Sequence, residues 1–119
     1  RFRACPRLSI GQALMNQTIV CGVGNVYKSE VLFLRRLNPF ARIEQLADDE
    51  LRQLTLEARR LMQQNLNGYP RRTRFGRDGQ RVWVYRRSGL PCFVCGTSIR
   101  MRRQGDLGRV TYWCPSCQS

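Results

Sequence analysis

Hydrophobic residues recur at helical spacing through the first half of the chain and predict three helices. Ser9 followed three residues later by Gln12 is typical of a capping box, which predicts a helix from there to about Asn16. A second helix is predicted to begin at Asn25 and to end at Asn38-Pro39. It is apolar on nearly all sides and should be central and buried, with apolar residues at Val26, Tyr27, Val31, Leu32, Phe33, Leu34 and Leu37.

The third predicted helix starts near Asp48, and acidic residues in its first turn suit the helix dipole. Its apolar residues follow a period close to 3.6 and are Leu51, Leu54, Ala58, Leu61, Met62 and Leu66. Beyond it, Gly68 and Pro70 mark a change of composition. We therefore expect helices in residues 1–66, an arginine-rich connector in 67–91, and short strands in 92–119.

Four cysteines in the last segment form two Cys-x-x-Cys pairs, Cys92 with Cys95 and Cys114 with Cys117. Two such pairs, separated by a hairpin, are a strong signature of a structural zinc ribbon. Gly96 follows the first pair, where the turn often needs a positive φ. Two disulfides, or four unrelated thiols, are the alternative. The predicted fold is thus mainly α with a small β zinc ribbon, and the expected cofactor is one structural Zn²⁺. Cys5 and Cys21 remain as buried or incidental thiols.

Charge indicates the kind of partner. Lysine and arginine number 21 against 8 acidic residues, a formal net charge of +13, and Lys28 is the one lysine. Such an excess on a small chain points to a polyanion, most naturally nucleic acid, because arginine matches phosphate and guanine edges well. A merely soluble basic surface is the alternative.

The turn before the second helix is a further candidate site. Gly22-Val-Gly24-Asn25 leads into the helix, whose first amides have no partner within the helix. Those amides and the helix dipole can hold an anion, and Asn25 can cap the helix or donate its side-chain amide to a phosphate oxygen. Glycines before a helix can equally serve the turn alone.

Three separated motifs together resemble one family. Residues 16–33, 84–92 and 109–118 are similar to the helix-two-turn-helix motif, the zinc-finger entry and the closing strand of the formamidopyrimidine-DNA glycosylase and endonuclease VIII family. The resemblance implies a helix-two-turn-helix bundle followed by a four-cysteine zinc-finger β-hairpin, both binding DNA. The short stretch from Tyr69 to Val82 and the Trp before Cys114 favour the endonuclease VIII branch.

The resemblance also implies roles for single residues. Asn25 would contact a phosphate next to the lesion, and Arg109 would reach the same backbone from the hairpin. Gly24 and Lys28 complete the expected DNA-binding set, with Lys28 on a charged position that meets solvent or phosphate. Glu30, inside the second helix, is expected to form a structural hydrogen bond to nearby backbone rather than to act as a catalytic acid.

Catalysis is not expected from this chain alone. Family enzymes use the amine of an N-terminal proline, followed by glutamate, to attack the sugar C1′ and start AP-lyase cleavage. Here the sequence starts Arg1-Phe-Arg, and Pro6 is internal, so its nitrogen is an amide. We therefore assign no catalytic residue and expect the catalytic N-terminal domain to be missing.

The expected partner is double-stranded DNA with a damaged or abasic site, in base-excision repair. The competing class is a stand-alone, ribosome-associated zinc-ribbon module that binds RNA and has no enzymatic activity. A transcription-factor zinc ribbon fits less well, since no helix is placed to read the major groove. The sequence has no secretory signal and no apolar run of about eighteen residues, so we expect a cytoplasmic, nucleoid-associated monomer with no membrane partner.

Overall fold

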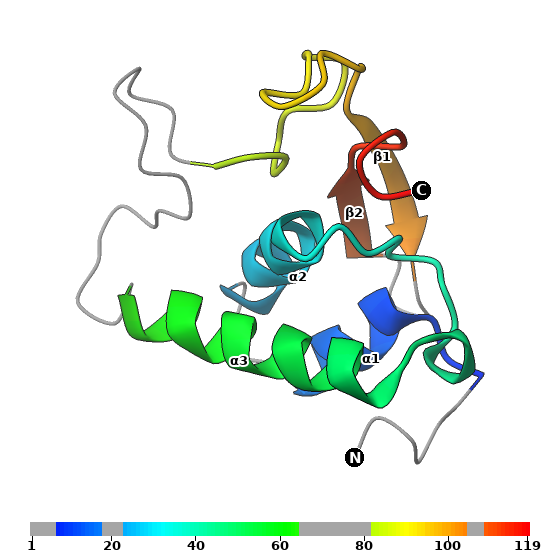
Figure 1. Cartoon of the computed structure of the whole chain (residues 1–119). Coiled ribbons are helices and arrows are strands. Elements are labelled where there is room, and N and C mark those ends of the chain that lie inside the picture. The colour runs from blue at the N-terminus through cyan, green and yellow to red at the C-terminus, as the bar shows by residue number, and fades with distance from the viewer. Residues whose placement is uncertain (1–6, 18–22, 65–81, 105–108) are drawn as a thin grey trace.

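The fold was analysed in a computed structural model that describes residues 7–17, 23–64, 82–104 and 109–119. In these segments the elements run α1 (Ile10–Gln17), α2 (Val23–Leu34), a 3-10 turn η2 (Ile43–Gln45), α3 (Asp48–Gln64), β1 (Arg100–Gln104) and β2 (Arg109–Trp113). Helix α2 lies between α1 and α3 on one side and the β-hairpin on the other (Figure 1). The predicted class, helices followed by a zinc-finger hairpin, is confirmed.

The starts of α1 and α3 agree with the sequence. Ser9 Oγ accepts a hydrogen bond from the Gln12 amide at 3.4 Å and donates one to Gln12 Oε1 at 3.0 Å, which closes the predicted cap. At α3, Glu50 Oε1 accepts the Ala47 amide at 2.9 Å, so the acidic first turn caps the helix as well.

The prediction for α2 was wrong at both ends. The helix begins at Val23, two residues before Asn25, and it ends at Leu34 rather than at Asn38. Arg36 has φ of 57°, and the amides of Arg36 and Leu37 bond back to the carbonyls of Phe33 and Leu32 at 3.0 and 2.9 Å. This is a Schellman termination, in which a left-handed residue stops the helix before the proline does.

Two cores share α2. The first core joins the three helices through Ile10, Ala13, Leu14, Tyr27, Val31, Leu32, Leu37, Ile43, Leu46, Leu51, Leu54, Ala58 and Leu61. The second core lies under the zinc cysteines and contains Phe33, Val84, Cys92, Ile99 and Cys114, with Trp83, Tyr112 and Cys117 at its edge. Every residue from Val26 to Phe33 is buried, which confirms the predicted central helix. Leu66 and the side chain of Met62 lie outside the description, as do Cys5 and Cys21.

The hairpin is antiparallel, with Gln104 opposite Arg109 and Arg100 opposite Trp113. Its strands also contact the segment after α2: the Phe40 ring meets Trp113 edge-on at 4.9 Å between centroids, and the Arg102 guanidinium lies 5.2 Å from the same ring. The hairpin is therefore packed on the helical part rather than attached by one linker.

Among the helices that the structure describes, none has the length and hydrophobicity that a membrane span requires.

Candidate zinc centre and nucleic-acid interface

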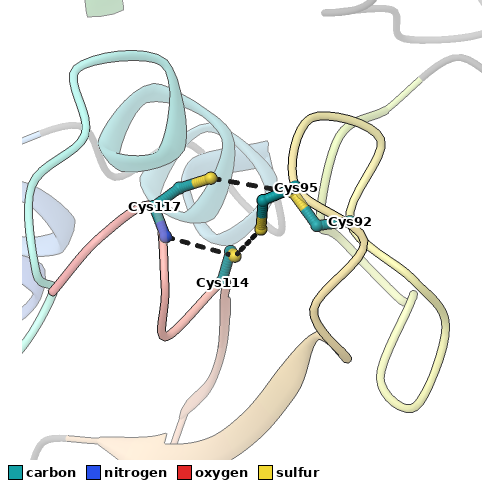
Figure 2. Close-up of side chains that lie close together, drawn as sticks. All are labelled: Cys92, Cys95, Cys114 and Cys117. Carbon is teal, nitrogen blue, oxygen red and sulfur yellow. Dashed lines mark hydrogen bonds between the residues drawn. The ribbon is translucent and has the colours of Figure 1, made fainter.

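The four predicted cysteines come together at one end of the hairpin (Figure 2). Their sulfur atoms all lie within 4.8 Å of one another; Cys95 and Cys114 are 3.4 Å apart, and Cys92 and Cys117 are 3.9 Å apart. A tetrahedral zinc ion with Zn–S bonds of about 2.3 Å spaces its sulfurs about 3.8 Å apart. A disulfide would need about 2.05 Å. The cluster fits one zinc ion and not two disulfides.

Each cysteine pair lies on a tight turn that directs backbone amides at sulfur. The amide of Val94 donates to Cys92 Sγ and that of Cys117 to Cys114 Sγ, both at 3.4 Å. Gly96 adopts φ of 80°, as predicted, and its amide closes the first turn on the Cys92 carbonyl at 2.9 Å. These donors stabilise thiolates, the form that binds metal.

The thiol pKa values diverge within the cluster. A hydrogen bond from the Thr97 side chain lowers the pKa of Cys95 to about 6, whereas burial raises the pKa of Cys117 to about 12. Thiols this close oppose each other's ionisation, and a divalent cation removes that opposition. Four thiolates leave no coordination position for a reactive water, so the site is structural.

Gln118 connects the second cysteine turn to α2. Its side chain is fully buried; Oε1 accepts the Cys114 amide at 2.9 Å, and Nε2 donates to the Leu37 carbonyl at 2.9 Å. The zinc site is thereby fixed to the segment that follows α2.

Helix α2 also runs along the free edge of β2. Lys28 Nζ donates to the Val110 carbonyl, and the Tyr112 amide donates to Ser29 Oγ, both at 3.3 Å. Two side chains of a helix thus occupy the edge where a third strand would pair. The carbonyl and amide of the strand edge are satisfied without a further strand.

Lys28 therefore differs from the sequence-based expectation in one respect. It is 1% exposed, so the expectation that it meets solvent was wrong. The hairpin, some 82 residues further on, covers it. Burial, and to a smaller extent the charge of Arg109, lowers the pKa of Lys28 to about 8. The charge of Arg109 acts on the buried ammonium group, so the two cations add to a local positive potential.

Of the other expected DNA-binding residues, Arg109 is exposed at the start of β2, and Gly24 and Asn25 lie in the first turn of α2. The side chain of Asn25 lies outside the description, as does Gly22. The structure thus places Lys28 against Val110, the neighbour of Arg109 in β2, and the contact of Asn25 with phosphate stays a prediction.

Glu30 is structural, as predicted. It is fully buried and accepts three backbone amides, from Trp83 at 2.7 Å, Val84 at 2.8 Å and Tyr85 at 3.0 Å. This carboxylate holds the segment entering the zinc finger against α2.

Sequence reasoning missed Gln104. It is a buried polar residue that bonds across the hairpin to Thr111 and across the molecule to Ser9. A glutamine beside arginines on a short strand carries no signal that would have singled it out.

Comparison with known families now decides between the candidate classes. The family model described as the formamidopyrimidine-DNA glycosylase H2TH domain matches residues 3–74, and the one described as the zinc finger found in FPG and IleRS matches residues 89–119. The chain belongs to the formamidopyrimidine-DNA glycosylase family. Its four cysteines are the ligands of that family's zinc finger and hold one structural zinc ion.

Curated relatives include proteins named endonuclease 8 2 and proteins named formamidopyrimidine-DNA glycosylase. The chain is 43% identical over 120 residues to a probable endonuclease 8 2 of Streptomyces coelicolor, covering 99% of this chain and 43% of the relative. It is 37% identical over 117 residues to a formamidopyrimidine-DNA glycosylase of Prochlorococcus marinus, covering 92% and 40%. The chain therefore spans less than half the length of these relatives.

Solved structures of the family share the fold. The MutM (Fpg) protein of Thermus thermophilus superposes with a TM-score of 0.77 at 31% identity, covering 98% of this chain and 47% of that one. Lactococcus lactis Fpg in complex with abasic-site DNA gives 0.77 at 29% identity, covering 99% and 44%.

Proposed function

We propose that this chain binds duplex DNA at damaged or abasic sites, as the C-terminal DNA-binding region of a base-excision-repair glycosylase and AP lyase of the endonuclease VIII branch. The observation that carries the proposal is the packing of α2 along β2, where Lys28 bonds the carbonyl of Val110, the residue next to the exposed Arg109. Family membership and the DNA complex of a structural relative support it.

The proposed site combines phosphate donors from two elements. The first turn of α2, which holds Gly24, offers backbone amides and the side chain of Asn25, and the hairpin offers Arg109. Lys28 is buried beneath the hairpin, so it adds positive potential rather than a direct phosphate contact. Such contacts fix DNA by its backbone and carry no base specificity. Lesion choice would then come from a catalytic domain outside this sequence, which would also supply the nucleophile.

Two finer assignments belong to the same proposal. Relatives named endonuclease 8 2 are 39–43% identical to the chain, against 37–38% for those named formamidopyrimidine-DNA glycosylase, which favours the endonuclease VIII branch. We further infer that the protein acts in the bacterial cytoplasm at the nucleoid, where its substrate would be. The ribosome-associated alternative gains no support from these relatives.

The test is DNA affinity by fluorescence anisotropy for the zinc-loaded chain, with an abasic-analogue duplex and an undamaged one. Arg109→Ala and Asn25→Ala should each weaken binding about ten-fold, since a hydrogen bond to a charged partner is worth roughly 1.5–3 kcal/mol. The control Arg52→Ala removes an exposed arginine on α3 that pairs with Asp49 at 2.7 Å, and should cost much less.

Three outcomes decide the matter. Equal losses from all three substitutions would mean a diffuse cationic surface and would overturn the assigned site. Tighter binding to structured RNA than to abasic duplex would transfer the function to the ribosomal class. A covalent adduct trapped by borohydride with this chain alone would show that it contains a nucleophile after all.

A further inference from the structure

Gln104 joins three parts of the molecule through one buried side chain. It is the last residue of β1 and is 8% exposed. Its Nε2 donates to Ser9 Oγ at 2.8 Å and to the Pro39 carbonyl at 2.9 Å, while its Oε1 accepts the Thr111 hydroxyl at 2.6 Å. The amide thus satisfies both donors and its acceptor, and ties both strands of the hairpin to the start of α1 and to the segment after α2.

Gly11 leaves the space that this amide fills. A Cβ on Gly11 would lie 2.4 Å from Gln104 Oε1, 2.6 Å from Nε2 and 2.8 Å from Cδ. Gly11 is the second residue of α1, where glycine costs stability relative to alanine. The backbone of α1 is ordinary helix there, so the close approach of Gln104 is the reason that a glycine fits this position.

The register of the hairpin connects Gln104 to the proposed DNA site, because its cross-strand partner is Arg109. The opposite edge of β2 is held by Lys28 and Ser29 of α2. Gln104 therefore supplies the second anchor of the strand that carries Arg109. Without it, the hold on that end of the hairpin would come, within the part of the chain that the structure describes, from the contacts of β2 along α2.

We propose that Gln104 is a positioning residue for Arg109: seated in the space left by Gly11, it fixes the end of the hairpin so that the guanidinium meets a DNA phosphate. This inference rests on the proposed function, since it assumes that Arg109 binds DNA. Gln104 itself touches no DNA in this scheme. It contributes to affinity because it holds Arg109 in position before the DNA phosphate binds.

Gly11→Ala is the most informative variant. The three atoms nearest to the new methyl group all belong to the far end of the Gln104 side chain, which must move to make room, and alanine favours the helix more than glycine does. The fold should be retained while the anchor is lost, because the helix preference of alanine offsets part of the cost of the hydrogen bonds that Gln104 gives up. A merely structural role for Gln104 predicts that affinity follows stability, whereas a positioning role predicts that affinity falls even where stability does not.

A matched pair tests the same anchor from β2. Thr111→Val removes the hydroxyl that bonds Gln104 Oε1 and nearly keeps the side-chain shape, whereas Thr111→Ser keeps the hydroxyl. Thr111→Ser should bind DNA like the starting chain, and Thr111→Val should bind more weakly. Gln104→Ala is the direct variant, and the Gly11 and Thr111 variants keep the inference testable if it folds poorly.

The measurements are abasic-duplex affinity by anisotropy over a series of salt concentrations, zinc content, and thermal unfolding. Gly11→Ala should lose roughly five- to ten-fold in affinity, close to the loss from Arg109→Ala itself. The slope of log K against log salt should become shallower by up to about 0.9, the value for one phosphate contact. In the Arg109→Ala background, Gly11→Ala should cost almost nothing more, because both act on one contact.

The two proposals fail in different ways. If Arg109→Ala leaves affinity unchanged, the proposed DNA site is wrong, whatever Gln104 does. If Arg109→Ala weakens binding but Gly11→Ala and Thr111→Val bind normally, the positioning role is overturned and the DNA site stands. Full additivity of Gly11→Ala with Arg109→Ala would overturn the positioning role as well.

Discussion

Glu30→Gln is the sharpest test of how the zinc finger is attached to the helices. In the structure Oε2 accepts the amides of Val84 and Tyr85, and Oε1 accepts that of Trp83. A glutamine has one acceptor oxygen, so at least one of the three amides must face an NH₂ group. The substitution keeps the shape and removes the charge together with part of the hydrogen bonding.

The magnitude follows from those bonds. Losing one hydrogen bond to a charged acceptor costs roughly 1.5–3 kcal/mol, and the bonds that remain become neutral and weaker by about 1 kcal/mol each. A neutral glutamine does not have the desolvation penalty of a buried carboxylate, and this gain offsets part of the lost hydrogen-bond energy. We expect a net loss of about 2–4 kcal/mol in the free energy of unfolding, a large share of the roughly 5–15 kcal/mol that holds a typical domain together.

The assay is urea unfolding of the zinc-loaded chain, followed by far-UV circular dichroism and by tryptophan fluorescence. The control Glu44→Gln changes an exposed glutamate whose partner Arg42 is 3.6 Å away, and should cost less than about 1 kcal/mol. If Glu30→Gln unfolds within about 0.5 kcal/mol of Glu44→Gln, the three amides are not held by this carboxylate and the attachment described above is wrong.

Two further predictions concern the metal and Lys28. Removal of zinc by a chelator should change tryptophan fluorescence more than helical circular dichroism. Both tryptophans, Trp83 and Trp113, lie on the hairpin side, whereas the first core contains no zinc ligand. Zinc release that leaves the fluorescence unchanged would contradict the placement of the second core. The pKa of Lys28 is lowered from 10.5 to about 8, so between these pH values the folded state binds fewer protons than the unfolded state. The cost of burying the ammonium group therefore applies in full below about pH 8 and is relieved as the pH rises towards 10.5. The unfolding free energy of the starting chain minus that of Lys28→Met should therefore rise with pH over that window. The starting chain should bind DNA more tightly than Lys28→Met at low pH, and this difference in affinity should shrink as pH rises. If neither difference changes with pH, Lys28 is not a buried cation.

Local sequence signals predicted the parts of the fold that depend on near neighbours. The acidic first turn of α3 and its 3.6-residue period gave the helix its start and its buried face, and the cysteine spacing gave the zinc centre. Helix α2 was predicted to be buried because it is apolar on nearly all sides. The helix signals lie within a few residues of the feature that they predict, and each Cys-x-x-Cys pair of the zinc centre is likewise a local signal.

What the sequence could not predict depends on residues far apart in the chain. Arg36 adopts a left-handed conformation, for which the sequence gives no signal because the position is not a glycine or an asparagine. Helix α2 therefore ends four residues before Asn38. The partners of Glu30 and Lys28 are 53 and 82 residues away. A charged side chain on a helix is usually taken to be solvated, and only the packing of the hairpin on α2 shows otherwise.

Three consecutive polar residues of α2 explain why zinc matters to a proposed DNA site that it does not touch. Lys28 and Ser29 hold the edge of β2, and Glu30 holds the segment that enters the zinc finger. Successive helical residues point about 100° apart, so the contacts of these three residues are spread over about 200° of the helix surface. The first core contacts the rest of that surface. The helix whose first turn carries Asn25 is thus fixed on one side to the strand that begins with Arg109 and on the other side to α1 and α3. Zinc stabilises the frame that sets the distance between those two residues, and DNA binding by two such donors is most favourable when that distance is set before the phosphate arrives.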